Sequence, residues 1–329
     1  MIELEEQIEY LEYKDQNNEL IRTNVPLKRD GIYYLSGEEQ YWLISSGKNK
    51  DLQNPFINKG IIGIGWDKIT LDEIKNNNEE DLKKILLEKY KDLEKIYTKI
   101  SDFKRYISGA VTKLRRFVYE MQLGDIIVLK DRGSNRIYFG KIISEAEDYS
   151  EEDLPIDNIA GNCNKIRKIR WLKSIEKDKL GSELKLALTA RHALSLIGLN
   201  KVKTEINREI FSYFYCGENL HIVFNIELAS NISQDFFKEF LDYIYNLKQK
   251  CIEENKSENN FNIKTNVQSP GPVEYFGNPE IAKYIYGVVT GLGIAGTCCI
   301  YNSIKEKLKI KNPQKNDEEI DKDRFSEGN

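Results

Sequence analysis

Histidine is scarce in this 329-residue chain, which contains two, His192 and His221. The five cysteines include no C-x-x-C pair: Cys163, Cys216, Cys251, Cys298 and Cys299. A structural zinc site needs four Cys or His ligands, usually grouped at short spacings. We therefore expect no metal site, and reduced, mostly buried thiols.

Motifs for catalysis are also missing. The chain has no Walker loop, no G-x-S-x-G elbow and no H-E-x-x-H helix. The segment "DKLGSELK" places Asp178, Glu183 and Lys185 in a loose acid–acid–lysine pattern of the kind that metal-dependent nucleases use. Such triplets arise by chance in a Lys/Glu-rich chain, and His192 has no evident nucleophile partner. We expect no enzyme activity and no cofactor, with a metal-dependent nuclease as a minor alternative.

An excess of basic charge is absent too. Charged residues make up 31% of the chain, but the formal net charge is −4 and the isoelectric point is about 5.6. Any contact with nucleic acid must therefore be local. The first residues, "MIELEEQIEYLEYKDQ", are acidic and lack the basic and apolar regions of a secretory signal, which favours cytoplasmic synthesis.

Periodicity predicts an α+β chain. Strand-like segments are "IYYLSGEEQYWLISSG", "KGIIGIGW", "DIIVLK", "IYFGKIIS" and "KIRKIRWLKSI", and the charged residues 70–121 between the second and third are helical. This order predicts a small β-barrel with inserted helices. Further along, "LKLALTARHALSLIGL" and "KVKTEINREIFSYFY" read as helices, "NLHIVFNIEL" as strand, "SQDFFKEFLDYIYNLKQKCIEEN" as an amphipathic helix and "NFNIKTNVQSPGPVEYFG" as strand.

Five segments follow from this pattern. We expect an acidic N-terminal segment (1–30), a ligand-binding barrel domain (31–176), an α/β connecting domain (177–278), an apolar glycine-rich helix (279–305) and a charged disordered tail (306–329).

Residues 41–172 resemble a PUA-like domain of the EVE type. The resemblance rests on the order and spacing of "YWLISSG", "GIIGIGWDKI", "LGDIIVLKDRG", "IYFGKIISEAEDY" and "RKIRWL". It implies a small barrel that binds nucleic acid or a nucleobase in a cleft beside an aromatic cage. Domains of this family often act as sensors in bacterial restriction and antiphage systems.

The side chains in this region suit such a role. A base can stack on Trp42, Trp66 or Trp171, and Ser45, Ser46 or Asn135 can read its edge by hydrogen bonds. The alternative for each tryptophan is an ordinary place in the core, because Trp is usually largely buried.

The predicted helix 101–121 carries opposed apolar and basic faces. Its apolar positions are Phe103, Tyr106, Ile107, Ala110, Val111, Leu114, Phe117, Val118 and Met121. Its basic positions are Lys104, Arg105, Lys113, Arg115 and Arg116. With Lys130 and Arg132 in the loop "KDRGSNR", this face predicts a groove that follows phosphates, and a simple solvated face is the alternative.

Residues 284–304, "YIYGVVTGLGIAGTCCIYNSI", form a 21-residue run without charge. As a helix it would be about 31 Å long, enough for a bilayer core of about 30 Å. Gly287, Gly291, Gly293 and Gly296 would let helices approach closely. The lysines that follow conflict with a cytoplasmic sensor under the positive-inside rule. Three alternatives stay open: post-translational insertion as an oligomer, a helix in the membrane interface with its lysines on anionic lipid, and a buried core helix or oligomer seam.

The whole arrangement resembles the membrane effectors of nucleotide-signalled bacterial antiphage defence, such as those of CBASS, Pycsar and Hailong systems. This implies that the barrel senses a nucleotide or single-stranded nucleic-acid oligomer and gates a homo-oligomeric channel, with four copies as our guess, at the inner membrane. The alternative is a soluble cytoplasmic EVE-type reader of nucleic acid or a modified base that recruits a partner.

Overall fold

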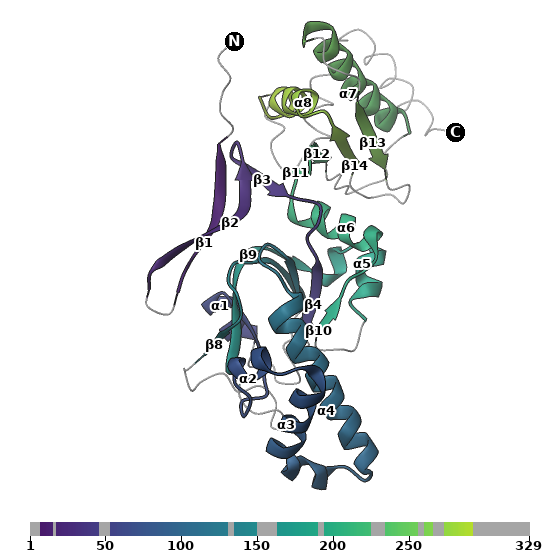
Figure 1. Cartoon of the computed structure of the whole chain (residues 1–329). Coiled ribbons are helices and arrows are strands. Elements are labelled where there is room, and N and C mark those ends of the chain that lie inside the picture. The colour runs from purple at the N-terminus through teal and green to yellow at the C-terminus, as the bar shows by residue number, and fades with distance from the viewer. Residues whose placement is uncertain are drawn as a thin grey trace, which may run out of the picture. The chain divides into compact units, whose positions relative to one another are not determined.

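The computed structural model describes residues 7–15, 18–45, 53–130, 135–149, 163–189, 194–224, 234–255, 260–265 and 273–291. They form a mixed α+β structure with curled sheets, which confirms the expected class (Figure 1). The chain divides into two compact units, Met1–Ile210 and Phe211–Asn329.

A curled sheet forms the centre of the first unit. Its strands are β4 (Tyr41–Ser45), β5 (Ile61–Ile64), β6 (Ile126–Lys130), β7 (Arg136–Ile142), β9 (Lys165–Glu176) and β10 (Leu194–Leu196), with the short β8 (Glu147–Asp148) beside β9. The order is β10-β4-β6-β7-β9-β5. Strands β4 and β6 are parallel, and the other pairs are antiparallel. The predicted barrel strands are thus confirmed, in a sheet that curls into a half-barrel.

The predicted helical insertion between β5 and β6 is also confirmed. It contains α2 (Leu71–Asn76), α3 (Glu79–Lys89), the 3-10 helix η2 (Lys91–Ile96), α4 (Ile100–Arg115) and the π-helical segment η3 (Arg116–Glu120); α1 (Gln53–Lys59) precedes β5. Thr70 and Glu73 form a capping box at the start of α2, and the Asn78 side chain caps α3. Helices α3 and α4 lie side by side (Figure 1).

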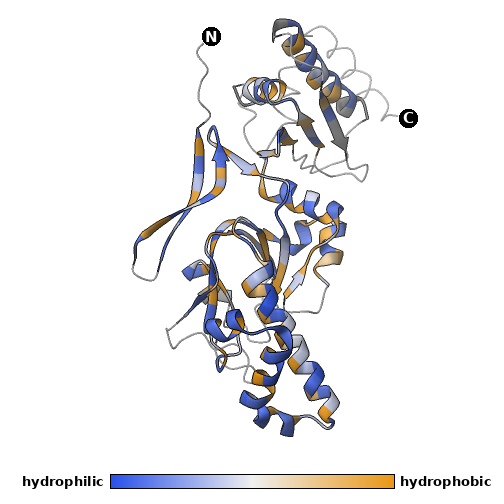
Figure 2. Cartoon of the chain, in the orientation of Figure 1, coloured by the Kyte–Doolittle hydropathy of each residue, from blue (hydrophilic) through white to orange (hydrophobic). Residues whose placement is uncertain are grey.

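The apolar face predicted for α4 lies in the core. Its buried residues are Phe103, Ile107, Ala110, Val111 and Leu114, and Phe117 and Val118 continue the face through η3. Figure 2 shows hydrophilic and hydrophobic residues alternating along α3 and α4, as expected for helices with one buried side.

The wider turn of η3 frees backbone carbonyl groups, and a buried arginine satisfies them. The Arg167 guanidinium donates hydrogen bonds to the carbonyl oxygens of Phe117 (2.8 Å), Val118 (3.1 Å) and Ser144 (3.0 Å). Arg167 has no exposed surface. It therefore joins β9 to the end of the helical insertion.

The N-terminal residues contain strands that the acidic composition did not predict. Strands β1 (Ile8–Lys14) and β2 (Leu20–Arg29) form an antiparallel pair, and β3 (Ile32–Leu35) pairs with β2. Leu11 and Leu27 are buried. Exposed and half-buried residues alternate from Leu20 to Val25 of β2, and this period-two pattern allows one face of the hairpin to pack.

The first unit extends past the boundary expected at residue 176. The 3-10 helix η4 (Lys177–Lys179), α5 (Ser182–Ala187), β10 and α6 (Asn200–Ile210) all belong to it. The helix expected over 184–199 is wrong at Leu194–Leu196, because these residues pair with Trp42–Ile44 of β4. Strand pairing outweighs the helical propensity of a short leucine-rich segment.

The second unit contains four strands that pair antiparallel in the order β11-β12-β14-β13. The strands are β11 (Tyr213–Cys216), β12 (Asn219–Phe224), β13 (Phe261–Thr265) and β14 (Val273–Gly277), with helices α7 (Gln234–Asn255) and α8 (Pro279–Gly291). The expected α/β character is confirmed, but the helix expected through Tyr215 is wrong from Phe211 onward, because α6 ends at Ile210 and β11 begins at Tyr213. The Tyr213 ring stacks on Tyr286 of α8 at 3.8 Å between centroids.

The apolar run at 284–304 is described only as far as Gly291, the last residue of α8. Ile281, Ile285 and Val289 of α8 are buried, whereas Gly287 is exposed and a Cβ there would meet no atom within 4 Å. Gly293, Gly296 and the tail 306–329 lie outside the described residues. No helix within the described residues combines the length and apolar character needed to cross a bilayer.

Candidate functional site

Trp66, directly after β5, has an unusual backbone. Its φ angle is +76°, in the left-handed region that bulky residues rarely adopt. Two other described non-glycine residues have positive φ, Asn18 and Asp30, and both are types that tolerate it in turns. Strain of this kind costs about 1–3 kcal/mol and is concentrated at functional sites. Trp66 is therefore the centre of the candidate site.

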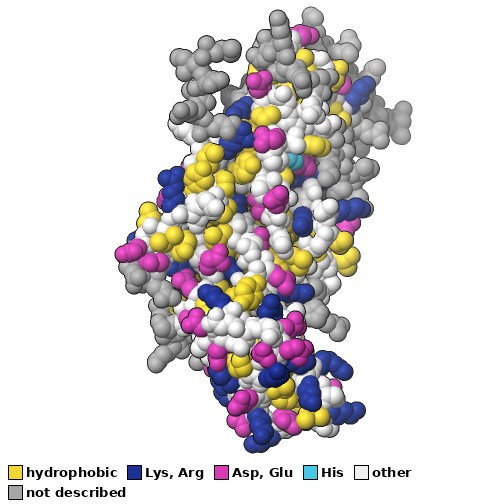
Figure 3. All heavy atoms as spheres, in the orientation of Figure 1, with side chains coloured by type: hydrophobic (Ala, Val, Ile, Leu, Met, Phe, Trp, Pro, Cys, Tyr) yellow, Lys and Arg dark blue, Asp and Glu magenta, His cyan; other side chains and the backbone are white. Residues whose placement is uncertain are grey.

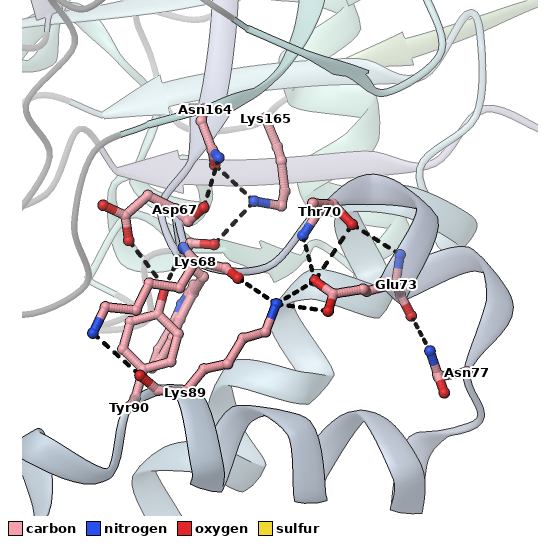
Figure 4. A network of polar contacts seen from close by, with 10 residues as sticks. Asp67, Lys68, Thr70, Glu73, Asn77, Lys89, Tyr90, Asn164 and Lys165 are labelled. Carbon is pink, nitrogen blue, oxygen red and sulfur yellow. Dashed lines mark hydrogen bonds and ion pairs between the residues drawn. The ribbon is translucent and has the colours of Figure 1, made fainter.

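Hydrogen bonds from Lys165, the first residue of β9, and from Asn164 just before it hold the Trp66 turn (Figure 4). The Trp66 carbonyl oxygen accepts from the Ile69 amide (3.0 Å) and from Lys165 Nζ (3.0 Å). Lys165 Nζ also donates to Asn164 Oδ1 (2.7 Å), and Asn164 Nδ2 donates to the Asp67 carbonyl oxygen (2.9 Å). Two residues almost a hundred positions downstream thus fix the strained turn.

Tyr90, at the end of α3, holds the turn from the other side. Its hydroxyl donates to Asp67 Oδ1 (3.1 Å) and accepts from the Lys68 amide (2.9 Å). Burial raises the pKa of Tyr90, so the hydroxyl keeps its proton at neutral pH. Lys68 Nζ lies 5.2 Å from the centroid of the Tyr90 ring. The Asp67 carboxylate is therefore oriented by a neutral donor.

An ion pair links α2 to α3 beneath this turn. Lys89 Nζ lies 2.6 Å from Glu73 Oε1 and donates to the Lys68 carbonyl oxygen at 2.8 Å. Burial opposes ionisation of Glu73, but the bonds from Lys89 and from Thr70 together lower the pKa of Glu73 below its ordinary value. The start of the helical insertion is thus anchored to the turn that carries Trp66 (Figure 4).

A cluster of rings, the aromatic cluster, extends from Trp66. Its members are Trp66, Tyr90, Tyr97, Phe103 and Tyr106. The Trp66 ring centroid lies 4.9 Å from that of Tyr90 and 5.2 Å from that of Tyr106, which lies 5.5 Å from that of Tyr97. Trp66 is 4% exposed and Tyr90 is buried, but Tyr97 and Tyr106 are half-buried. The cluster therefore reaches solvent through two tyrosines.

A buried charge lies behind the turn. Lys165 has no exposed surface, and burial lowers its pKa to about 8. The ammonium group is therefore mostly protonated at pH 7 and adds positive charge next to the Trp66 carbonyl. Burial also raises the pKa of the nearby Cys163 thiol to about 12, which keeps this sulfur protonated and unreactive.

Trp42 and Trp171 do not join this cluster. Trp42 has no exposed surface, and its Nε1 donates to Asp125 Oδ2 at 2.8 Å. Trp171 is half-buried; its Nε1 donates to the Phe56 carbonyl oxygen at 3.2 Å, and its ring lies 6.4 Å from that of Tyr138. Of the three tryptophans, Trp66 is therefore the one in contact with Tyr106, and through Tyr106 with Tyr97.

The basic residues predicted for phosphate contact differ in availability. Lys104 and Arg105 are exposed, with Arg105 Nη1 3.5 Å from Asp102 Oδ1. Arg115 lies over the Tyr119 ring at 5.0 Å, and Arg116 Nε lies 3.5 Å from Glu120 Oε2. All three arginines are therefore partly neutralised or covered. Lys104 is exposed and has no ion pair with a described residue, and it lies with Arg105 on the same turn of α4 as Tyr106.

The residues predicted to read a base edge lie apart from the aromatic cluster or outside the described chain. Asn135 Nδ2 donates to Asp178 Oδ2 at 2.9 Å, and Lys130 Nζ donates to the Leu188 carbonyl oxygen. The Ser45 hydroxyl oxygen is buried at the end of β4 and has no hydrogen-bond partner among the described residues. Ser46 and Arg132 lie outside the described residues.

The nuclease-like triplet does not form a metal-binding constellation. Lys185 Nζ donates to the backbone oxygen of Asp178 at 2.8 Å, and Glu183 is exposed. Across the part of the chain that the structure describes, no three His, Cys, Asp or Glu side chains come together in a group that could hold a metal ion.

One family model covers the region just described. Residues 42–193 match the "Domain of unknown function (DUF8426)". The matched segment is under half of the chain and contains the half-barrel from β4 to α5, the helical insertion and every member of the aromatic cluster. No curated protein matches the sequence.

Sequence reasoning found Trp66 but missed its partners. Asp67, Tyr90, Tyr97 and Lys165 were not singled out, and Tyr106 was placed only on an apolar face. The one available signal was the "GWD" that ends a buried strand, since a large ring and a carboxylate in a tight turn are unusual.

Proposed function

We propose that the half-barrel is a PUA-like, EVE-type reader that binds a nucleotide or single-stranded nucleic acid, with a nucleobase against the aromatic cluster. The observation that carries this proposal is the strained backbone of Trp66, fixed by Lys165 at the start of β9 and by Asn164 just before it. A strained aromatic residue that several hydrogen bonds from neighbouring segments hold in place is typical of a ligand site.

The chemistry of the site suits a base with an amino group. Base stacking on an aromatic ring contributes about 1–3 kcal/mol per base. Tyr106 and Tyr97 supply rings that reach solvent, and the Asp67 carboxylate can accept from an exocyclic amino group. Lys104 and Arg105 precede Tyr106 on α4, where they can contact the phosphates of the same strand.

This proposal favours the reader over the channel. A reader needs only the half-barrel and a partner to recruit. The channel hypothesis depends on residues 284–304, of which 292–304 lie outside the described residues, so it stays a prediction. A role in antiphage defence likewise stays a prediction from the resemblance.

A titration of the full chain tests the proposal. Short single-stranded DNA and RNA oligomers and cyclic dinucleotides would be added at two salt concentrations, with fluorescence anisotropy as the measurement. Tyr106→Ala should weaken binding about 5- to 150-fold at both salt concentrations, the equivalent of removing one stacked ring. Tyr245→Ala, at an exposed position on α7, is the matched control and should bind as the wild type does.

Phosphate contact has a separate signature. Replacing Lys104 and Arg105 together by alanine should reduce the salt slope by about 1.4, because each single-strand phosphate that is no longer neutralised lowers the slope by about 0.7. Tyr106→Ala should leave this slope unchanged. If none of the ligands binds above background, the half-barrel is not a nucleic-acid reader and the aromatic cluster has a structural role.

A further inference from the structure

The helical insertion has an open hollow on its outer side. The hollow has a volume of about 460 Å³ and lies between α3, η2 and α4. Its lining residues are Lys84, Leu87, Glu88, Lys91, Glu94, Ile100, Phe103 and Lys104. Figure 3 shows basic and acidic side chains mixed with hydrophobic ones at this end of the first unit, where Figure 1 places α3 and α4.

Apolar side chains are exposed beside the hollow. Ile96 is 63% exposed and Ile100 is 56% exposed, and both lie where η2 turns into α4. Leu82 and Leu86 already supply the inward face of α3, and α4 has its own buried face. Ile96 and Ile100 therefore add nothing to the core, and Ile100 continues directly into the apolar floor of the hollow.

Charges around the hollow are of both signs. Lys84 pairs with Asp81 at 2.8 Å, but the side chains of Glu88, Lys91, Glu94 and Lys104 form no ion pair with any described residue. A nucleic acid would favour a uniformly basic rim. A rim with two free carboxylates and two free ammonium groups is instead complementary to itself, as a two-fold symmetric contact requires.

We propose that this hollow is the docking site for a second copy of the chain. In the contact, an isoleucine of each copy enters the hollow of the other, and the lysines of one rim face the glutamates of the partner rim. Pairing two helical hairpins in this way gives four packed helices, a common stable arrangement. The hollow shares Phe103 and Lys104 with the nucleobase site, so the dimer is tested without nucleic acid present. The proposal does not use the glycine-rich segment at 284–304.

Sedimentation velocity of the full chain over a concentration series tests this dimer. Wild type should dimerise in the micromolar range, and Ile96→Glu and Ile100→Glu should each weaken dimerisation at least tenfold. The matched control is Leu186→Glu, because Leu186 is 68% exposed on α5, away from the hollow. This control should dimerise as wild type. A wild type that stays monomeric, or isoleucine variants that dimerise unchanged, would overturn the proposal.

Charge reversal at the rim of the hollow provides a second, independent test of the dimer. Glu88→Lys and Lys104→Glu should each weaken the dimer, and the double variant should restore it if lysine and glutamate meet across the contact. Gly291→Leu separates this contact from association through the glycine-rich segment and should leave the dimer intact. Dimers absent in Gly291→Leu but kept in Ile96→Glu would refute docking at the hollow.

Discussion

The buried charge of Lys165 should make the stability of the first unit depend on alkaline pH. Lys165 has no exposed surface, and burial lowers its pKa from 10.5 to about 8. The difference between these pKa values corresponds to about 3 kcal/mol of unfavourable free energy whenever the amine is protonated in both the folded and unfolded states.

The direction of the effect follows from proton binding. Below pH 8 the lysine is protonated in both states, so its unfavourable contribution is complete and constant. Between pH 8 and 10.5 the unfolded chain binds more protons than the folded chain, so stability rises with pH. From pH 7 to pH 10 the wild type should gain about 2–3 kcal/mol from this residue alone.

Lys165→Met removes this pH-dependent contribution. At pH 7 the variant is relieved of the buried charge but loses the bonds to Trp66 and Asn164, each worth roughly 1 kcal/mol. We therefore expect a variant about 1–2 kcal/mol more stable than wild type at pH 7, and about 1 kcal/mol less stable at pH 10.

Urea unfolding followed by tryptophan fluorescence measures this directly, because all three tryptophans belong to the first unit. Lys201→Met, at an exposed position on α6, controls for the loss of a lysine elsewhere. If the difference between Lys165→Met and wild type is the same at pH 7 and pH 10, Lys165 does not hold a buried proton and the reasoning fails.

Further predictions concern two glycines and the buried Arg167 of the first unit. Gly140→Ala should destabilise it by about 1–3 kcal/mol, because a Cβ at this position would lie 2.4 Å from Ile169 Cγ2 and 2.8 Å from Trp171 Cε3. Gly109→Ala, on the open surface of α4, should instead stabilise the first unit by about 0.5–1 kcal/mol. Equal changes in the free energy of unfolding for the two variants, measured by urea unfolding, would contradict this reasoning. Arg167→Lys should lower the free energy of unfolding by about 2–4 kcal/mol. One ammonium group cannot reach the carbonyl oxygens of Phe117, Val118 and Ser144 together. A decrease under about 1 kcal/mol in urea unfolding would show that η3 does not depend on Arg167.

Much of the first unit could be predicted from local patterns. The strands β4 to β7 and β9 are rich in β-branched and aromatic residues, and the helical insertion carries a regular 3.6-residue period. These signals are local, because the conformation that each segment prefers depends on its own side chains. The buried face of α4 followed from the same period.

Other features depend on which segments meet in space. The three residues of β10 form a strand because β4 offers them an edge, and Tyr213–Cys216 of β11 forms one because it pairs with β12. Each segment is too short for its own side-chain pattern to predict a strand next to the neighbouring helix. Its conformation is therefore determined by pairing with the partner strand.

The candidate site shows most clearly which features local sequence predicts and which depend on the tertiary structure. The sequence alone identified Trp66 as a large ring at the end of a strand. The tertiary structure decided that Trp42 fills the core with Asp125, and that Trp66 meets Tyr90 and Tyr106 from the helical insertion. It also decided that Lys165 and Arg167 lie buried, because the carbonyl groups that bind them come from segments far away in the chain. The side-chain pattern of a strand cannot predict a buried cation whose partners are backbone oxygens, because every residue has a backbone oxygen whatever its side chain.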